Sequence, residues 1–362
     1  MLRQLGCSWS DHMDNYGRIL VTGGTGFIGG RLVEVLAGRG AHIRVTTSEV
    51  RNRSRLAGLP VELVQANLLD HAALADAVIG CDVVFHFAYE FGGSAQDQQK
   101  ANVEGTRALA EAFLKNGGRR FVHISSVSAY GAPDDGDLSE DTPPKPTENA
   151  YSNTKLKIDR LLRDLHQTRG MPVAIVQPTI VYGPFGSTWT TRLLEQVRSC
   201  RIVLPSNGTG LCNAVYVDDV VAASMLTAEA DAAVGEAFLI SGSSPTTWRE
   251  FYSAYERMLG KQAILALDDQ QMCDEEEFER RSNSIYGRFR RKLARSLWKE
   301  VPPKFGLPLY LPDPGTRALY AAQTIVRIDK ARNKLGYRPA FDLEHGMALT
   351  REWAQRANLL SV

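Results

Sequence analysis

Short apolar runs alternate with longer amphipathic stretches through the first half of the chain. The runs have the length and composition of buried strands and lie at Ile19–Thr22, Ile43–Thr46, Glu62–Gln65, Val83–Phe87, Phe121–Ile124 and Val173–Val176. Between them, apolar residues recur at helical spacing over Gly29–Arg39, Ala72–Val78, Asn102–Lys115 and Tyr151–Thr168. This alternation predicts an α/β fold with a doubly wound parallel sheet over residues 18–184.

Beyond Pro184 the alternation gives way to mixed elements with scattered prolines. We expect residues 185–362 to form a smaller C-terminal substrate-binding lobe, from which the chain is free to cross back to the sheet. Residues 1–17 lack the apolar core of a signal peptide in their first dozen positions and are expected to form a tail. The Pro-, Asp- and Gly-rich segment Ala132–Thr147 predicts an exposed loop.

One segment of the lobe is strongly basic. Over residues 280–299, apolar side chains recur every four residues among arginines and lysines, at Ile285, Phe289, Leu293 and Leu297. This spacing predicts a basic amphipathic helix. Its role is open between a half-buried helix with a solvated face, a lid over substrate phosphates, and a contact with a membrane surface or partner.

Glycines follow the first predicted strand and open the first predicted helix, within Val21–Gly30. Gly23 permits a tight turn, Gly26 lets the backbone approach a pyrophosphate, and Gly29 lets helix and strand pack closely. The helix start adds free N–H groups and the positive end of its dipole. Although a plain tight turn is the simpler interpretation, this context favours a Rossmann-type dinucleotide site.

A second group of residues carries candidate catalytic chemistry. Ser125 and Ser126 end a buried strand, and Tyr151 and Lys155 are one helical turn apart on the same predicted helix face. An ammonium near a phenol lowers the phenol's pKa, so Tyr151 is a candidate acid/base on an alcohol oxygen that Ser126 holds. The simpler alternative is a chance spacing of these two residues on an exposed helix.

A histidine and a cysteine that could be reactive are expected to have structural roles. His86 is expected to be a packed residue at a strand end rather than an acid/base, and Cys212 a small buried hydrophobe rather than a nucleophile. With no CxxC pair, the five cysteines suggest neither a disulfide framework nor a zinc site, and no metal is expected.

Taken together, these motifs resemble the extended short-chain dehydrogenases/reductases, also described as the NAD-dependent epimerase/dehydratase family. The resemblance runs from about Arg18 to Trp353. Besides the glycine, Ser125–Gly131 and Tyr151–Lys155 segments, it rests on Asn67–Asp70, His86–Ala88, Asn102–Thr106, Pro178–Pro184 and Val215–Asp219.

The resemblance implies roles for individual residues. Tyr151 is the acid/base, Lys155 binds the nicotinamide ribose and tunes Tyr151, and Ser126 orients the substrate oxygen. The dinucleotide is expected against Gly23, Thr25, Gly26, Phe27, Ile28, Gly29, Asn67, Leu68, Phe87, Ala88, Tyr151, Lys155, Pro178 and Val181. Asn67 stands where the family more often has Asp, and its amide can still pair with adenine.

The choice between NAD and NADP depends on the end of the second strand. There the family usually has an acidic residue for the ribose 2′-OH, whereas this chain has Thr47, with Arg51 and Arg53 nearby. A hydroxyl and guanidinium groups suit a 2′-phosphate. We therefore expect NADP or NAD, with NADP favoured.

The substrate side departs from the family pattern at several positions. Val127 and Ser128 replace the acids of dehydratases and decarboxylases, so neither reaction is expected. Ile180 and Cys212 stand where nucleotide-sugar epimerases grip a diphosphate. Either the substrate lacks a nucleotide diphosphate, or other cations bind it. Candidate substrate contacts are Ser128, Arg288 and Arg291.

Bulk properties limit the partners. The formal net charge of +1 gives no reason to expect nucleic acid. No apolar run approaches the roughly 20 residues that span a bilayer. A cytoplasmic enzyme with a small-molecule substrate is expected, with no integral membrane segment. The helices over 102–115 and 151–168 are expected to pair in a homodimer, although covering the sheet is their simpler role.

The sequence thus predicts an NAD(P)-dependent oxidoreductase that interconverts a secondary alcohol and a ketone on a sugar-like or polyhydroxylated substrate. The alternative is a nucleotide-sugar epimerase that oxidises C4 transiently, because both reactions use the same residues. A catalytically silent dinucleotide-binding regulator is the third interpretation, and the presence of Ser126, Tyr151 and Lys155 speaks against it.

Overall fold

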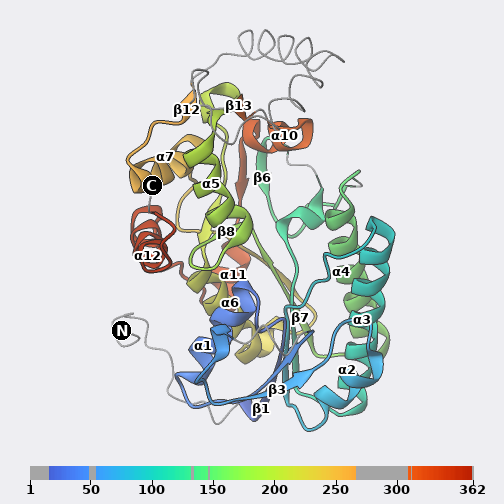
Figure 1. Ribbon diagram of the computed structural model, residues 1–362. Helices are drawn as coiled ribbons and strands as arrows, with labels where there is room; N and C mark the ends of the chain where they lie inside the picture. Colours follow the sequence, from blue (N-terminus) through green and yellow to red (C-terminus); the bar gives the residue numbers. More distant parts are fainter. Residues whose placement is uncertain are drawn as a thin grey trace.

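A computed structural model describes residues 16–48, 54–131, 134–145, 147–265, 309–310 and 312–360. Its centre is a seven-stranded sheet in the order β11-β7-β5-β4-β1-β2-β3, with every pair parallel (Figure 1). The strands are β1 (Arg18–Thr22), β2 (His42–Thr47), β3 (Val61–Gln65), β4 (Val83–His86), β5 (Arg120–Ile124), β7 (Val173–Pro178) and β11 (Ala237–Ile240). The predicted Rossmann-type fold is confirmed.

Helices cover both faces of this sheet (Figure 1). One layer holds α2 (His71–Val78), α3 (Ala95–Lys115) and α4 (Ala150–Arg169), and the other holds α1 (Phe27–Ala37), α6 (Val217–Glu229) and α11 (Asp329–Leu335). Because successive strand residues point to opposite faces, Leu20 joins the core with α3 while Ile19 and Val21 join the core with α1. The strands are therefore apolar on both sides.

The seventh strand, β11, comes from beyond the predicted end of the sheet domain. It pairs with β7, and α6 packs on β5 and β7, so the chain does return to the sheet after residue 184. The four-residue strand is short and fully buried, and such a run carries no alternation by which sequence reasoning recognises strands.

The remaining elements build a second lobe above the C-terminal ends of the strands (Figure 1). Its helices are α5 (Arg192–Ser199), α7 (Trp248–Leu259), α10 (Pro314–Ala321) and α12 (Leu343–Arg356). Short parallel strands join them: β8 (Ile180–Tyr182) with β10 (Ala214–Tyr216), and β9 (Arg201–Val203) with β12 (Ile264–Leu265) and β13 (Leu309–Tyr310). Short helical turns lie at η3 (Ser54–Leu56), η4 (Val127–Tyr130), η5 (Ser187–Thr191), η6 (Pro205–Gly208) and η7 (Asp231–Ala233).

Buried aromatic rings form the centre of this lobe. The rings of Trp248 and Tyr320 lie 4.3 Å apart, and the hydroxyls of Tyr252 and Tyr320 lie 2.8 Å apart. These side chains belong to the same buried cluster as Ile19 and Val21 of the sheet. The two lobes therefore share one continuous hydrophobic core.

The segment predicted as an exposed loop, Ala132–Thr147, contains a strand. Its β6 (Gly136–Leu138) pairs in parallel with β14 (Thr324–Val326), while Asp134, Asp135 and Asp137 remain exposed. The prediction of a loop throughout was wrong, because the partner strand lies far away in the sequence. This pairing fixes the segment that follows the turn of Ser126.

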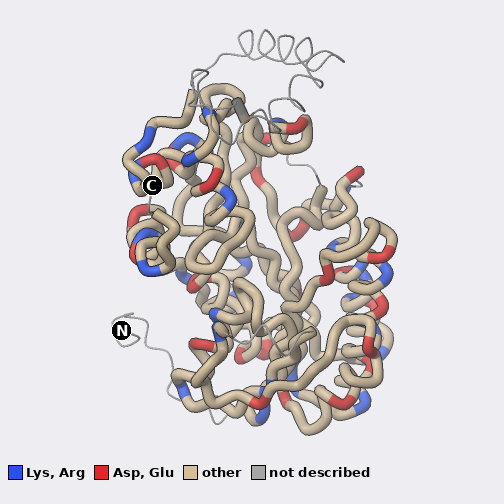
Figure 2. Tube along the Cα trace, in the orientation of Figure 1, with Lys and Arg blue, Asp and Glu red and all other residues tan. Residues whose placement is uncertain are grey.

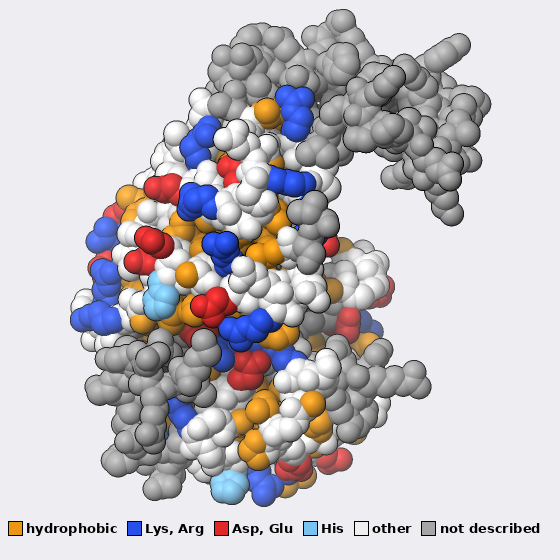
Figure 3. All heavy atoms as spheres, turned by 60° about the vertical axis from the view of Figure 1, so that its left-hand side comes forward, with side chains coloured by type: hydrophobic (Ala, Val, Ile, Leu, Met, Phe, Trp, Pro, Cys, Tyr) orange, Lys and Arg blue, Asp and Glu red, His pale blue; other side chains and the backbone are white. Residues whose placement is uncertain are grey.

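The described surface carries Lys and Arg interspersed with Asp and Glu (Figure 2), and on the face in Figure 3 both signs lie among apolar side chains. Across the described part of the chain, no helix is both long enough and apolar enough to cross a membrane. The predicted tail falls outside the described residues except for Tyr16 and Gly17, and the basic segment 280–299 falls outside them entirely. The homodimer through α3 and α4 stays a prediction.

Candidate active site

The glycine turn lies between β1 and α1, next to the start of the segment after β4. Gly23 has φ +69°, and a Cβ there would lie 2.7 Å from the Ala88 nitrogen. A Cβ on Gly29 would lie 2.4 Å from the Gly23 carbonyl oxygen. The helix begins after Gly26 without a side-chain cap, so its first N–H groups face the turn. Free N–H groups at a helix start are the kind of group that can hold a phosphate.

Its place in the sheet agrees with that role. The strand order runs outward in opposite directions from β1 and β4, which makes their carboxyl ends the switch point of the fold. At this edge, the N–H groups of Phe87 and Ala88 each donate to the Thr22 hydroxyl over 3.2 Å. The position of the glycine turn at the switch point of the sheet therefore supports a dinucleotide site at this edge.

The other predicted dinucleotide contacts lie along the same edge. Thr47 ends β2 and is buried. Asn67 follows β3, and its side-chain oxygen accepts from the N–H groups of Leu69 (2.8 Å) and Asp70 (3.1 Å). Leu68 is buried against Gly105 of α3. Arg51 and Arg53 lie outside the described residues.

His86 and Cys212 have the packed roles that the sequence favoured. The His86 ring lies between two threonine hydroxyls, with Nδ1 2.8 Å from Thr22 and Nε2 2.9 Å from Thr106. Burial, with a contribution from Lys155, lowers the pKa of His86 to about 3, so the ring is neutral. Burial raises the pKa of the Cys212 thiol, which makes it a poor nucleophile.

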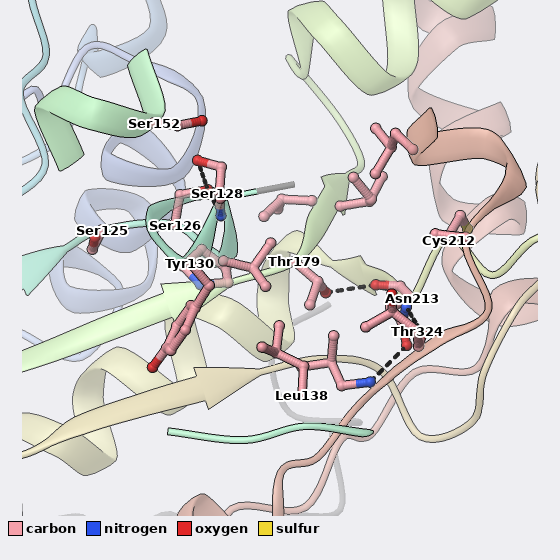
Figure 4. A pocket seen from close by; sticks show the side chains of 18 of the residues that line it. Ser125, Ser126, Ser128, Tyr130, Leu138, Ser152, Thr179, Cys212, Asn213 and Thr324 are labelled. Carbon is pink, nitrogen blue, oxygen red and sulfur yellow. Dashed lines mark hydrogen bonds between the residues drawn. The ribbon is translucent and has the colours of Figure 1, made fainter. Parts of the chain in front are cut away.

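Three hydroxyls meet where β5 turns into η4 and faces the start of α4. The Ser126 Oγ accepts from the Ser128 N–H (3.1 Å) and the Ser128 hydroxyl (3.0 Å), as Figure 4 shows. Tyr151 lines the same cavity as Ser126, and the Ser126 hydroxyl acts on the Tyr151 phenol to lower its pKa. Ser125 differs, because its hydroxyl donates to Asp159 on the buried side of α4 (2.9 Å). Ser126, rather than Ser125, shares the site with Tyr151.

Aromatic rings surround Tyr151. The ring of Tyr89 lies 5.0 Å from that of Tyr151, and the exposed Phe91 stacks at 6.4 Å. Behind them Lys155 is buried, with its Nζ donating to the Ile124 carbonyl over 2.8 Å. This Nζ lies 5.8 Å from the centre of the Tyr151 ring.

The electrostatics correct one expectation. Burial raises the pKa of Tyr151 to about 12, against the smaller influence of the Ser126 hydroxyl, which lowers it. The predicted net lowering of the Tyr151 pKa is wrong for this structure, because burial outweighs the groups that favour the phenolate. Burial also lowers the pKa of Lys155 to about 8, and the charge of Asp159 opposes that change.

A cavity of about 680 Å³ opens beside these hydroxyls. On the side of the glycine turn, the cavity is lined by Phe27, Ile28, Pro178 and Val181. Its other walls are largely apolar and come from η5, β6, α10, β14 and the turn before β10, namely Trp189, Leu138, Leu319, Ala322, Val326, Leu211 and Cys212. Figure 4 shows how these strands and turns face one another across the cavity.

Few charges reach this cavity. Among its described lining residues the acids are Asp134, Asp135 and Asp137, and the only Lys or Arg is Lys145. Lys145 is paired with Asp134. The predicted substrate contacts Arg288 and Arg291 lie outside the described residues, while Ser128 lines the cavity. Within the described residues, no group of three or more His, Cys, Asp and Glu side chains is arranged to hold a metal ion.

Sequence reasoning missed most of the cavity wall. Ile180 and Cys212, which were singled out as departures from the diphosphate grip, do line it. Gln177 of β7 is not part of the lining, because its side chain bonds to the buried Asp159. No local motif marks Trp189, Leu319 or Val326, because their position depends on tertiary packing.

Comparison with known proteins defines the family. The family model described as the NAD dependent epimerase/dehydratase family matches residues 19–241. The chain belongs to this family. Its members are NAD-dependent enzymes, with dehydrogenases, epimerases and dehydratases among them.

Two relatives and one solved structure are similar to this chain over most of its length. A 3-beta-hydroxysteroid dehydrogenase of Mycolicibacterium neoaurum is 28% identical, covering 92% of this chain and 90% of its own. A 4-hydroxy-2-methyl-3-oxo-4-farnesyl-3,4-dihydroquinoline-1-oxide ketoreductase of Stigmatella aurantiaca is 25% identical, covering 92% and 96%. The NAD-bound structure of a dTDP-glucose 4,6-dehydratase of Streptomyces venezuelae has a TM-score of 0.70 at 23% identity, covering 94% and 97%. At that identity the structural likeness shows the fold alone.

Proposed function

We propose that this enzyme interconverts a secondary alcohol and a ketone by NAD(P)-dependent hydride transfer. The observation that carries the proposal is the meeting of the Ser126 and Tyr151 hydroxyls at one end of a cavity whose near wall adjoins the glycine turn. A substrate oxygen bound to these hydroxyls has its carbon facing the dinucleotide edge.

Three side chains have separate roles in this reaction. The bound nicotinamide supplies or accepts the hydride. In the reducing direction, Ser126 donates a hydrogen bond to the carbonyl oxygen, and Tyr151 transfers its proton to that oxygen as the hydride reaches the carbon. Tyr151 is then reprotonated from solvent. The Lys155 ammonium stabilises the phenolate that forms in between, and oxidation of the alcohol reverses each step.

Net oxidation or reduction is favoured over epimerisation. The two relatives described above that match nearly the whole chain are a dehydrogenase and a ketoreductase. An epimerase returns the hydride to the opposite face of the same substrate and keeps its dinucleotide bound. The two functions are therefore separated by whether the freshly purified protein carries oxidised dinucleotide.

We further propose an uncharged, largely apolar substrate in place of the sugar-like one that the sequence favoured. A nucleoside diphosphate would bring negative charge to a cavity whose described lining offers three aspartates and a lysine already paired with one of them. Apolar walls suit a fused-ring or isoprenoid body, and cavities of this size hold small organic ligands. The names of the steroid dehydrogenase and the farnesylquinoline ketoreductase agree with this class.

The dinucleotide preference is proposed to be NADP. Thr47 ends β2 where an acidic residue would repel a 2′-phosphate, and Arg51 and Arg53 follow it in the sequence. The ratio of kcat/KM for NADPH to that for NADH, with one ketone held at saturation, measures this preference. A ratio below one would contradict it.

A substrate panel tests the function and the substrate class together. The full chain is incubated with NADPH or NADH and a neutral fused-ring ketone, such as a ketosteroid, and with the oxidised dinucleotide and the matching secondary alcohol. UDP-glucose and dTDP-glucose are run in parallel, and nicotinamide absorbance is followed. Turnover of the neutral pair alone supports both proposals. Epimerised UDP-glucose without net redox overturns the function, and turnover of sugar nucleotides with net redox overturns only the substrate class.

A further inference from the structure

A carboxylate is buried directly beneath the active site. Asp159 lies on α4 one turn beyond Lys155 and is 4% exposed. Its Oδ2 accepts from the Ser125 hydroxyl (2.9 Å) and from the Gln177 amide (2.8 Å). Gln177 in turn accepts from the Tyr130 hydroxyl over 3.0 Å. Two donors therefore hold one carboxylate oxygen in a fixed place.

The other oxygen of Asp159 has no hydrogen-bond partner. The closest basic nitrogen is His123 Nε2, at 4.0 Å, and neither ring nitrogen of His123 has a partner. Burial, aided by the charge of Lys155, lowers the pKa of His123 well below its ordinary value. His123 is therefore neutral and leaves the carboxylate charge uncompensated.

Lys155 is the cation placed to compensate it. The two residues are four apart on one helix, and both side chains are buried. The titratable and charged groups that face the pair come from α4 itself, from β4, β5, η4 and the segment after β4: Tyr151, Arg163, His86, His123, Tyr130 and Tyr89. The tyrosines have raised pKa values and the histidines lowered ones, so all are neutral near pH 7. Apart from Arg163, the pair is surrounded by neutral groups.

We propose that Asp159 is a positioning residue whose carboxylate keeps Lys155 protonated during turnover. The inference rests on the proposed function, since it assigns the ammonium a role in stabilising the Tyr151 phenolate. A neutral amine at Lys155 would leave that phenolate without a cation in a buried site, where such charge is costly.

The two side chains set a pH window for activity. Burial raises the pKa of Asp159 to about 6 and lowers that of Lys155 to about 8, so both are charged between these values. Below the window Asp159 takes up a proton and stops supporting Lys155. Above it the ammonium loses its proton. The rate should therefore fall at both lower and higher pH. The two apparent pKa values of this pH profile belong to the Asp159–Lys155 pair as a whole.

Replacing the charge while keeping the shape gives the sharpest test. In Asp159→Asn the amide oxygen can take the place of Oδ2 and keep both hydrogen bonds, from Ser125 and Gln177, while the amide nitrogen takes the unpartnered place of Oδ1. Without the carboxylate, Lys155 loses its proton at lower pH. Because an opposite charge close by shifts a pKa by about 1–3 pH units, kcat at pH 8 should fall about tenfold relative to kcat at pH 6.5.

A second variant should move the opposite limb. Ser125→Ala removes one donor to the carboxylate, so the pKa of Asp159 rises and the acid limb of kcat moves to higher pH, while the alkaline limb stays in place. The matched control is Asp164→Asn, the same change at an exposed position on α4, which should leave both limbs unchanged. An equal loss of kcat at every pH in Asp159→Asn, or an unmoved alkaline limb, would overturn the inference.

A measurement without turnover separates this inference from the proposed function. Lys155 is expected to donate to the nicotinamide ribose, so the Kd of NADPH, read from its fluorescence, should weaken as Lys155 deprotonates. In Asp159→Asn this weakening should begin at lower pH than in the parent chain. If no panel substrate reacts but this profile moves, the proposed function fails and the role of Asp159 stands. An identical binding profile in both proteins counts against that role.

Discussion

The dinucleotide edge and the substrate cavity are built in different ways. The edge consists of turns that follow β1, β2, β3 and β4 in chain order, each at the carboxyl end of its strand. The cavity wall combines η4 and β6 with η5, the turn before β10, and α10 and β14 from the C-terminal part of the chain. Local sequence patterns specify the first region, whereas only tertiary packing assembles the second.

The two regions also differ in the groups they present. The edge offers backbone N–H groups and glycines into which a side chain would not fit. The cavity offers largely apolar walls, with Ser126 and Tyr151 at one end. A substitution that affects only one region therefore tests whether the edge binds the dinucleotide and the cavity binds the substrate.

The largest expected effect comes from the hydroxyl that the two regions share. Tyr151→Phe removes the proposed proton donor, and general acid–base catalysis is worth about 10²–10⁴-fold, so kcat should fall by that factor. The dinucleotide Kd and the thermal midpoint should stay close to those of the parent. Steady-state kinetics and NADPH fluorescence measure these quantities.

Tyr182→Phe is the matched control, since it removes a buried hydroxyl from β8, outside the cavity lining. It should keep kcat within about twofold, because a long 3.4 Å hydrogen bond of this kind contributes little. A Tyr151→Phe protein with the parent's kcat would remove Tyr151 from the mechanism.

A charge in the cavity should be the next most harmful change. Leu319→Asp places a carboxylate on the α10 wall, and an unpaired polar group in an apolar site costs about 1–3 kcal/mol, so KM for a neutral ketone should rise about tenfold or more. The dinucleotide Kd should not change. Ile79→Asp, at an exposed position directly after α2 and outside the cavity lining, is the control and should leave both values alone. An unchanged KM in Leu319→Asp would show that the substrate binds elsewhere.

The converse test acts on the glycine turn. Gly29→Ala adds a Cβ 2.4 Å from the Gly23 carbonyl oxygen, so the turn must move away from the shape that receives the pyrophosphate. We expect the dinucleotide Kd to rise about tenfold, the equivalent of one or two lost backbone hydrogen bonds. KM for the ketone at saturating NADPH should stay the same. Gly315→Ala, where the added atom meets only a side-chain oxygen at 3.3 Å, serves as the control.

The smallest expected effect concerns stability. Asp219 of α6 accepts from the N–H groups of Ala340 (2.7 Å) and Phe341 (3.3 Å), and burial raises its pKa to about 7. The native state therefore holds a proton that the unfolded chain has released above about pH 4. Stability from this group is greatest at low pH and is lost as the pH rises through 7.

The measurement compares pH slopes. Between pH 5 and 8 the free energy of unfolding should fall by about 2 kcal/mol more in the parent than in Asp219→Asn, whose side chain does not ionise. Urea unfolding at a series of pH values gives both curves. Asp164→Asn should keep the parent's slope. Parallel curves for the parent and Asp219→Asn would rule out titration of Asp219 in the folded protein.

The features that could be predicted from the sequence are mainly those of the dinucleotide edge and the strands around it. Six strands, four helices and the positions of Gly23, Gly29, Ser126 and Tyr151 follow from periodicity and motif spacing, because these are short-range features. β11 and β6 do not, since each depends on a partner strand distant in sequence. The raised pKa of Tyr151 was also beyond reach, because it comes mainly from burial, which residue spacing does not show.

The late arrival of β11 has a practical consequence for anyone who wishes to express the dinucleotide-binding half alone. A fragment that stops at residue 184 leaves β7 as an edge strand, with its unpaired N–H and C=O groups free to recruit another chain. It also lacks α6, which would leave apolar positions of β5 and β7 open to water. Such a fragment should aggregate, whereas one that extends past Ile240 completes the sheet.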